Sequence, residues 1–119
     1  MFERIETGSG RILGFKVKGR LIDADYKNFV PVLEDAIKEH GKVNLFLEFE
    51  DFLGWDAKAA WDDYTTFMRF KDSIGRIAIV GENRWEKWMT KLGKLFMAEM
   101  NYYDIPETPN AWKWVREGI

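Results

Sequence analysis

Side chains suited to ligand binding occur just after two of the predicted strands. Phe52 and Trp55 follow one apolar run, and Arg84 and Trp85 follow another. In a parallel sheet, ligands bind in the crevice at the carboxyl ends of the strands, where these four residues would meet. Aromatic rings can enclose an apolar body, and a guanidinium can pair with an anionic group. The set predicts a site for an amphiphile with an anionic head; the alternative is that Trp55 and Trp85 fill the core.

A cationic surface is predicted beside this site. Over residues 84–96, apolar side chains fall on one side of a helix and basic side chains fall on the other. Four basic residues and Glu86 give this segment a net charge of +3, whereas the whole chain has −2. Such a helix could lie on an anionic membrane or on a partner, and the surface would include Lys87, Trp88, Lys91 and Lys94. The alternative is a helix packed on the sheet with an ordinary solvated charged face.

The residues do not define a reaction. His40 is the only histidine, and no partner for catalysis is placed beside it by sequence spacing. Six carboxylates could in principle assemble a cation site or an acid–base pair: Glu48, Glu50, Asp51, Asp56, Asp62 and Asp63. The alternative is that they are ordinary acidic residues, which are common where strands and helices end. We therefore expect a protein that binds rather than catalyses, without a metal or cofactor.

Composition limits the classes of partner and compartment. The chain has 119 residues, 46% of them hydrophobic, which suits one domain with a real core. A net charge of −2 argues against nucleic acid as a partner. The absence of cysteine suits a reducing cytoplasm. No signal peptide and no apolar run of about 20 residues is present, so membrane contact would be peripheral.

The elements that position these residues can be read from apolar periodicity. Strands are predicted at residues 2–6, 12–18, 43–49, 77–80 and 99–103. A helix is predicted at residues 23–40, with a kink or a late start at Pro31. Residues 51–56 are predicted to form a turn, and Asp56 should cap the next helix. We expect that helix to bury one stripe, namely Ala57, Ala60, Trp61, Tyr64, Phe67 and Met68.

The remaining helices complete the order of elements. One follows Gly81 over residues 84–96, and the last begins at Thr108, before Pro109. The order β-β-α-β-α-β-α-β-α predicts a single α/β domain over residues 1–119. Helical crossovers imply a mostly parallel sheet, with one antiparallel strand from the N-terminal hairpin.

With the elements placed, the chain resembles the SpoIIAA-like family, a branch of the bacterial domains related to STAS and CRAL-TRIO domains. The resemblance covers nearly the whole sequence. Its first part rests on Gly19, Leu21, Asp25, Tyr26, Phe29, Pro31, Leu33, Glu34, Gly41, Lys42 and Val43. Its second part rests on Asp51, Phe52, Gly54, Trp55, Trp61, residues 77–81, Trp85, Trp88, Tyr103, Asp104, Ala111 and Trp112. It implies a STAS-like fold.

The same resemblance suggests two roles. Relatives act in partner switching, as anti-anti-sigma factors do, or bind lipid-like ligands at a membrane. Partner switching uses a phosphorylatable serine or threonine after the central strand, and residues 51–56 contain neither. The leading expectation is a cytoplasmic binding domain for an amphiphile or an anionic membrane surface. The alternative is a protein-interaction module that binds a partner or a second copy of itself, as a homodimer, without a phospho-switch.

Overall fold

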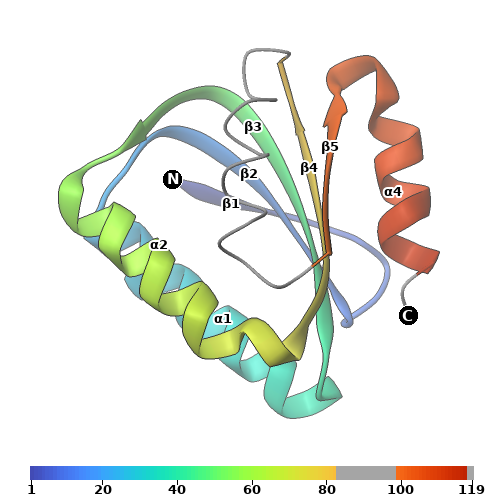
Figure 1. The fold of residues 1–119 in the computed structure, drawn as a ribbon, viewed down its shortest axis with the longest axis horizontal. Helices are drawn as coiled ribbons and strands as arrows, with labels where there is room; N and C mark the ends of the chain where they lie inside the picture. The colour runs from blue at the N-terminus through green and yellow to red at the C-terminus, as the bar shows by residue number, and fades with distance from the viewer. Residues whose placement is uncertain (83–98, 118–119) are drawn as a thin grey trace.

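The computed structural model describes residues 1–82 and 99–117. Its centre is a five-stranded sheet in the order β1-β2-β3-β4-β5 (Figure 1). β1 is antiparallel to β2, and all other neighbouring strands are parallel. The strands are β1 (Phe2–Ile5), β2 (Ile12–Leu21), β3 (Val43–Trp55), β4 (Ile74–Gly81) and β5 (Glu99–Asp104). The predicted mixed sheet is therefore confirmed, and the predicted helix at 84–96 lies outside the described residues.

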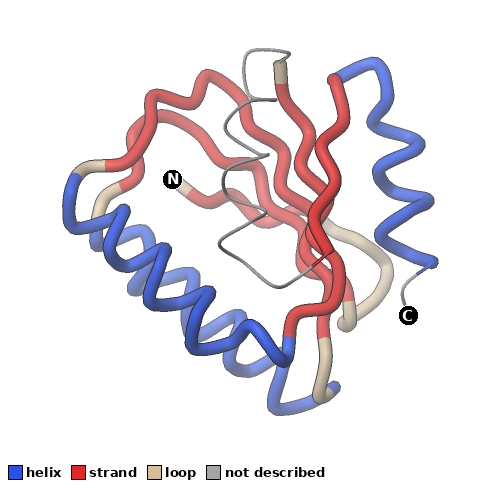
Figure 2. Tube along the Cα trace, in the orientation of Figure 1, coloured by secondary structure: helices blue, strands red, loops and turns tan. Residues whose placement is uncertain are grey.

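Helices cover both faces of the sheet. α1 (Asp23–His40) and α2 (Ala57–Phe70) lie side by side on one face, and α4 (Thr108–Glu117) lies on the other (Figures 1 and 2). Short 3-10 turns join α2 to β4 (Lys71–Ser73) and β5 to α4 (Ile105–Glu107). Among the described helices, none combines the length and apolar character needed to cross a membrane.

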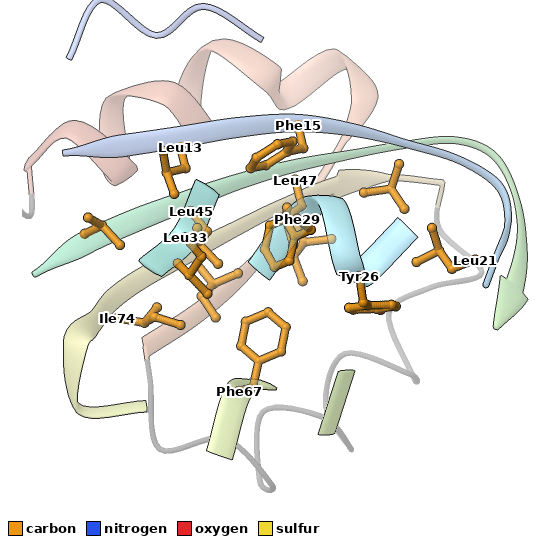
Figure 3. Close-up of a cluster of buried hydrophobic side chains, with 14 of the residues drawn as sticks. Leu13, Phe15, Leu21, Tyr26, Phe29, Leu33, Leu45, Leu47, Phe67 and Ile74 are labelled. Atoms are coloured by element: carbon orange, nitrogen blue, oxygen red, sulfur yellow. The ribbon is translucent and has the colours of Figure 1, made fainter. Parts of the chain in front are cut away.

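Alternation along β2 builds the larger core. Leu13, Phe15 and Val17 point to the α1 and α2 face and are buried. Phe29 and Leu33 of α1 pack on them, as Figure 3 shows. Each such side chain contributes about 1.5–3 kcal/mol when it is fully removed from water. This packing fixes α1 on the sheet.

Pro31 does not delay the start of α1. The helix begins at Asp23, where the Asp25 carboxylate accepts a hydrogen bond from the Ile22 backbone N–H at 2.9 Å. Phe29 and Leu33 lie on either side of Pro31 and are buried against the sheet, so packing holds both halves of the helix in place. Of the two alternatives expected at Pro31, the late start was wrong, because this packing outweighs the one backbone hydrogen bond that proline removes. A kink at Pro31 stays a prediction.

β3 continues through the segment predicted to be a turn. It pairs with β2 as far as Leu21 and Trp55, with two register shifts near Gly19. The pairing skips Asp51 and Leu53, so both are bulge residues, and Asp51 has φ 50°. The prediction of a turn at 51–56 was therefore wrong, because the turn-forming residues Asp51 and Gly54 bend a strand without ending it.

α4 seals the second face of the sheet. The Trp112 ring stacks on the Phe46 ring with centroids 3.7 Å apart, and the Arg116 guanidinium also lies over the indole, 5.0 Å from its centroid. The Asn44 side-chain amide donates a hydrogen bond to the Val115 carbonyl at 2.7 Å. The predicted last strand and last helix are confirmed, and both are held by this second core.

Candidate functional site

The carboxyl ends of the parallel strands form two separate pairs. β2 and β3 remain paired up to Leu21 and Trp55, whereas β3 and β4 pair only up to Glu48 and Val80. β4 and β5 end together at Gly81 and Asp104. The end of β3 therefore extends well past its neighbour β4.

Phe52 and Trp55 belong to an aromatic cluster at the end of β3. Phe52 is only 5% exposed, and its ring meets those of Phe49 and Trp55 edge to face at centroid distances of 4.9 and 4.8 Å. The Trp55 indole N–H donates a hydrogen bond to the Tyr26 hydroxyl at 2.9 Å. Both residues face other protein groups in this structure, and their part in ligand binding stays a prediction.

The other predicted binding residues lie outside the described ranges. These are Arg84 and Trp85 of the amphiphile site, and Lys87, Trp88, Lys91 and Lys94 of the cationic surface. Beside them in sequence, the ends of β4 and β5 line a hollow of about 270 Å³. Its described lining is Gly81, Glu82, Asp104, Ile105 and Pro106.

A buried polar network lies between α1, α2 and β3. Tyr26 is in the first turn of α1, Asp63 is in the second turn of α2, and Trp55 ends β3. The Tyr26 hydroxyl donates a hydrogen bond to the Asp63 carboxylate at 2.7 Å and accepts the one from Trp55. Three separate elements thus meet at one hydroxyl group.

Burial changes the titration of this network. Asp63 as a residue is partly exposed, but burial of its carboxyl raises the pKa to about 6, while the hydrogen bond from Tyr26 opposes that rise. Burial and the nearby Asp63 carboxylate also raise the pKa of Tyr26. The Asp63 carboxyl therefore titrates closer to neutral pH than an ordinary aspartate does.

A small cavity adjoins the network. Its volume is about 20 Å³, enough for about one water molecule. Its polar lining comes from Tyr26, Trp55 and Asp63, and aromatic rings form much of the rest, including Phe2, Phe49 and Phe67. The site is an apolar chamber with one carboxyl group.

The sequence carried a signal for this network that our prediction missed. By sequence alone, Asp63 is one of several acidic residues near the start of α2, and Tyr26 is one of the apolar positions of α1. Asp63 is four residues after Ala59 and four before Phe67, and both of these are buried. A carboxylate on that buried stripe would have pointed to a partner in the core.

Two further carboxyl groups interact between the N-terminal parts of the same helices. The interaction between the Asp23 and Asp62 carboxyl groups lowers the pKa of Asp23 and raises that of Asp62. Lys27 and Lys58 lie 3.2 and 3.4 Å from the Asp23 carboxylate. Within residues 1–82 and 99–117, no group of three or more acidic or histidine side chains is placed to hold a metal ion.

The outer face of α2 differs from the prediction. Phe67 is buried, as expected, together with Ala59 and Thr66. Trp61 is 63% exposed, Tyr64 43% and Met68 36%. Ala57 and Ala60 are exposed as well. The predicted stripe was therefore correct only for Phe67, because α2 is rotated to turn Ala59, Asp63 and Phe67 towards the sheet.

Comparison with known proteins agrees with this architecture. The model of the family described as SpoIIAA-like matches residues 12–116. The chain belongs to the SpoIIAA-like family. An uncharacterised protein of Shewanella loihica, from the DUF3478 family and with a SpoIIAA-like fold, has a similar structure with a TM-score of 0.81. It is 21% identical, and the alignment covers 97% of this chain and 92% of that one. No curated protein matches the chain.

Proposed function

We propose that this SpoIIAA-like domain is a non-catalytic protein-interaction module that pairs with a second copy of itself through the outer face of α2. The observation that carries the proposal is an exposed stripe, which we call the α2 stripe: Ala57, Trp61, Tyr64 and Met68. Large apolar side chains gathered on one exposed face are typical of an interaction surface.

The spacing of the α2 stripe suits helix pairing. Its residues are four, three and four positions apart, which is the spacing of a coiled-coil seam. The Trp61 and Tyr64 rings already adjoin, with centroids 5.9 Å apart. A helix whose other side is fixed in the core can offer this seam to a second helix.

The stripe is also complementary to itself. If two copies of α2 pair antiparallel about the middle of the stripe, Ala57 lies opposite Met68 and Trp61 lies opposite Tyr64. A small side chain then faces a long one, and an aromatic ring faces an aromatic ring. A single two-fold axis satisfies both contacts, as in most homodimers.

The size of the stripe predicts a weak dimer. Its three large side chains expose on the order of 300 Å² per protomer. A stable interface buries roughly 800 Å² per partner. We therefore expect association in the micromolar range or weaker, with monomers at low concentration.

The self-association can be tested by sedimentation velocity over a concentration series. The wild-type sedimentation coefficient should rise with concentration, and Trp61→Ala should weaken the association about tenfold or more, because it removes the largest exposed ring. Ile105→Ala is the matched control, since it shortens an exposed apolar side chain away from α2. A wild type that stays monomeric throughout, or a Trp61→Ala variant that associates equally well, would refute the proposal.

Binding of an amphiphile is the second candidate. The hollow at the ends of β4 and β5 supports it, because ligands of parallel sheets bind at this edge. The residues predicted for it are Phe52, Trp55, Arg84 and Trp85, with a membrane-facing surface on Lys87, Trp88, Lys91 and Lys94. Native mass spectrometry should then find a co-purifying amphiphile, and anionic vesicles should sediment the protein in a salt-sensitive manner. A protein that purifies without a ligand and does not sediment with anionic vesicles at low salt would exclude this candidate.

A further inference from the structure

The Asp63 carboxyl is an unusual group for the interior of a small domain. It lies beside an apolar chamber and accepts a hydrogen bond from the Tyr26 hydroxyl. Removing a carboxylate from water is costly unless a counter-charge compensates for it. Within the described residues, the cations Lys27 and Lys58 of the same two helices contact Asp23 instead.

The chamber is shaped for a small polar head. Its volume of about 20 Å³ accommodates one group of the size of a water molecule. Phe2, Phe49 and Trp55 line the chamber and are only partly buried. A chain attached to the head would have to be narrow enough to leave between the partly buried rings.

We propose that this chamber binds a primary ammonium group at the end of an unbranched alkyl chain. An ammonium has about the size of a water molecule and carries three N–H donors. The Asp63 carboxylate supplies the counter-charge. The Tyr26 oxygen accepts one hydrogen bond from Trp55 and has a second lone pair for the ligand. The rings of Phe2, Phe49 and Phe67 supply cation–π contacts around the charge.

The same contacts predict which ligands should not bind in the chamber. A carboxylate or phosphate head would be repelled by Asp63, unlike the anionic head predicted for the Arg84 and Trp85 site. A quaternary ammonium is too large for the chamber. The ammonium could belong to a free alkylamine or to a lysine side chain of another protein. The chamber lies on the inner side of α2, and the α2 stripe takes no part in it.

The test uses the full chain and follows the Trp55 indole N–H signal in two-dimensional NMR, assigned with Trp55→Phe. This proton lies in the network, so it reports on the chamber directly. Butylammonium should shift it saturably, whereas butanol, butyrate and tetramethylammonium should bind at least about tenfold more weakly. Equal affinity for butanol, or no saturable shift with butylammonium, would overturn the proposal.

Two variants separate binding from folding. Asp63→Asn keeps the shape and an acceptor for Tyr26 but loses the charge, so it should lower butylammonium affinity about tenfold or more while remaining folded. Asp35→Asn removes a carboxylate from the exposed side of α1 and should bind as the wild type does. Unchanged affinity in Asp63→Asn would also overturn the proposal. Acetyl-lysine methylamide binding as tightly as butylammonium would identify a protein side chain as the ligand, and weaker binding would identify a free amine.

Discussion

At the residue scale, Asp63 is unusual because its carboxyl group is buried among aromatic side chains. A carboxyl group on the buried stripe of α2 faces aromatic rings, and a tyrosine hydroxyl donates to it. The apolar neighbours follow directly from the helical pattern of the sequence. The contact with Tyr26, 37 positions earlier in the chain, depends on how α1 and α2 sit beside each other. Local patterns cannot supply that relation.

Asp63 should make the free energy of unfolding depend on pH. Because burial raises its pKa to about 6 in the folded protein, the folded state binds the proton more strongly than the unfolded state. This stabilisation is fully present at low pH and is lost as the pH rises through about 6. Between about pH 5 and pH 7.5, the free energy of unfolding should fall by on the order of 1 kcal/mol because of Asp63.

Urea denaturation at several pH values can measure this effect. Asp63→Asn should be more stable than the wild type near neutral pH, and the difference between the two should shrink as the pH falls. Asp35→Asn corrects for the general effect of one fewer charge on this helical layer. A difference between wild type and Asp63→Asn that does not change with pH would show that Asp63 titrates normally.

At the element scale, α2 shows how far periodicity can be trusted. Apolar residues at helical spacing correctly predicted the helix and its start at the Asp56 cap, whose carboxylate accepts from the Ala59 N–H. They did not reveal which apolar side faces the sheet, because α2 has two such sides. Trp61 is the larger ring, yet Phe67 is the buried one. β3 failed in a related way, since Asp51 and Gly54 suit a bulge as well as a turn.

The orientation of α2 can be checked by comparing two truncations of aromatic side chains. Phe67→Ala should lower the free energy of unfolding by about 3–5 kcal/mol, because it opens a cavity in the core. Trp61→Ala should change it by less than about 0.5 kcal/mol, because that ring lies in solvent. Thermal or urea unfolding of dilute monomer measures both. The reverse order of effects would mean that α2 turns its other side to the sheet.

At the scale of the whole molecule, the sequence predicted the fold better than it predicted any single site. Alternating strands and helices predicted the mixed sheet, and the resemblance carried by Tyr26, Phe29, Gly54 and Trp112 agrees with the family match. A fold is specified by many weak signals spread along the chain, so one misread turn does little harm. A site depends on a few exact contacts, and Arg84 and Trp85 remain predictions.

The two-sided architecture predicts that α4 is indispensable. Among the described residues, the second core consists of four buried sheet side chains together with Ala111 and Val115 of α4: Ile12, Phe46, Ala78 and Val80. Exposing them would cost about 1.5–3 kcal/mol for each large side chain, which approaches the roughly 5–15 kcal/mol of a typical domain. A chain ending at Glu107 should therefore lose cooperative thermal unfolding and bind a hydrophobic dye. A cooperative transition in that truncated chain would contradict the prediction.

The two sides of α2 belong to one stiff rod. Asp63 and Trp61 are two residues apart, one facing the interior and the other facing solvent. A rod anchored on one side cannot tilt or slide there without carrying its opposite side along. The fluorescence emission of the Trp61 indole should for this reason respond to changes at the buried Asp63 carboxyl group.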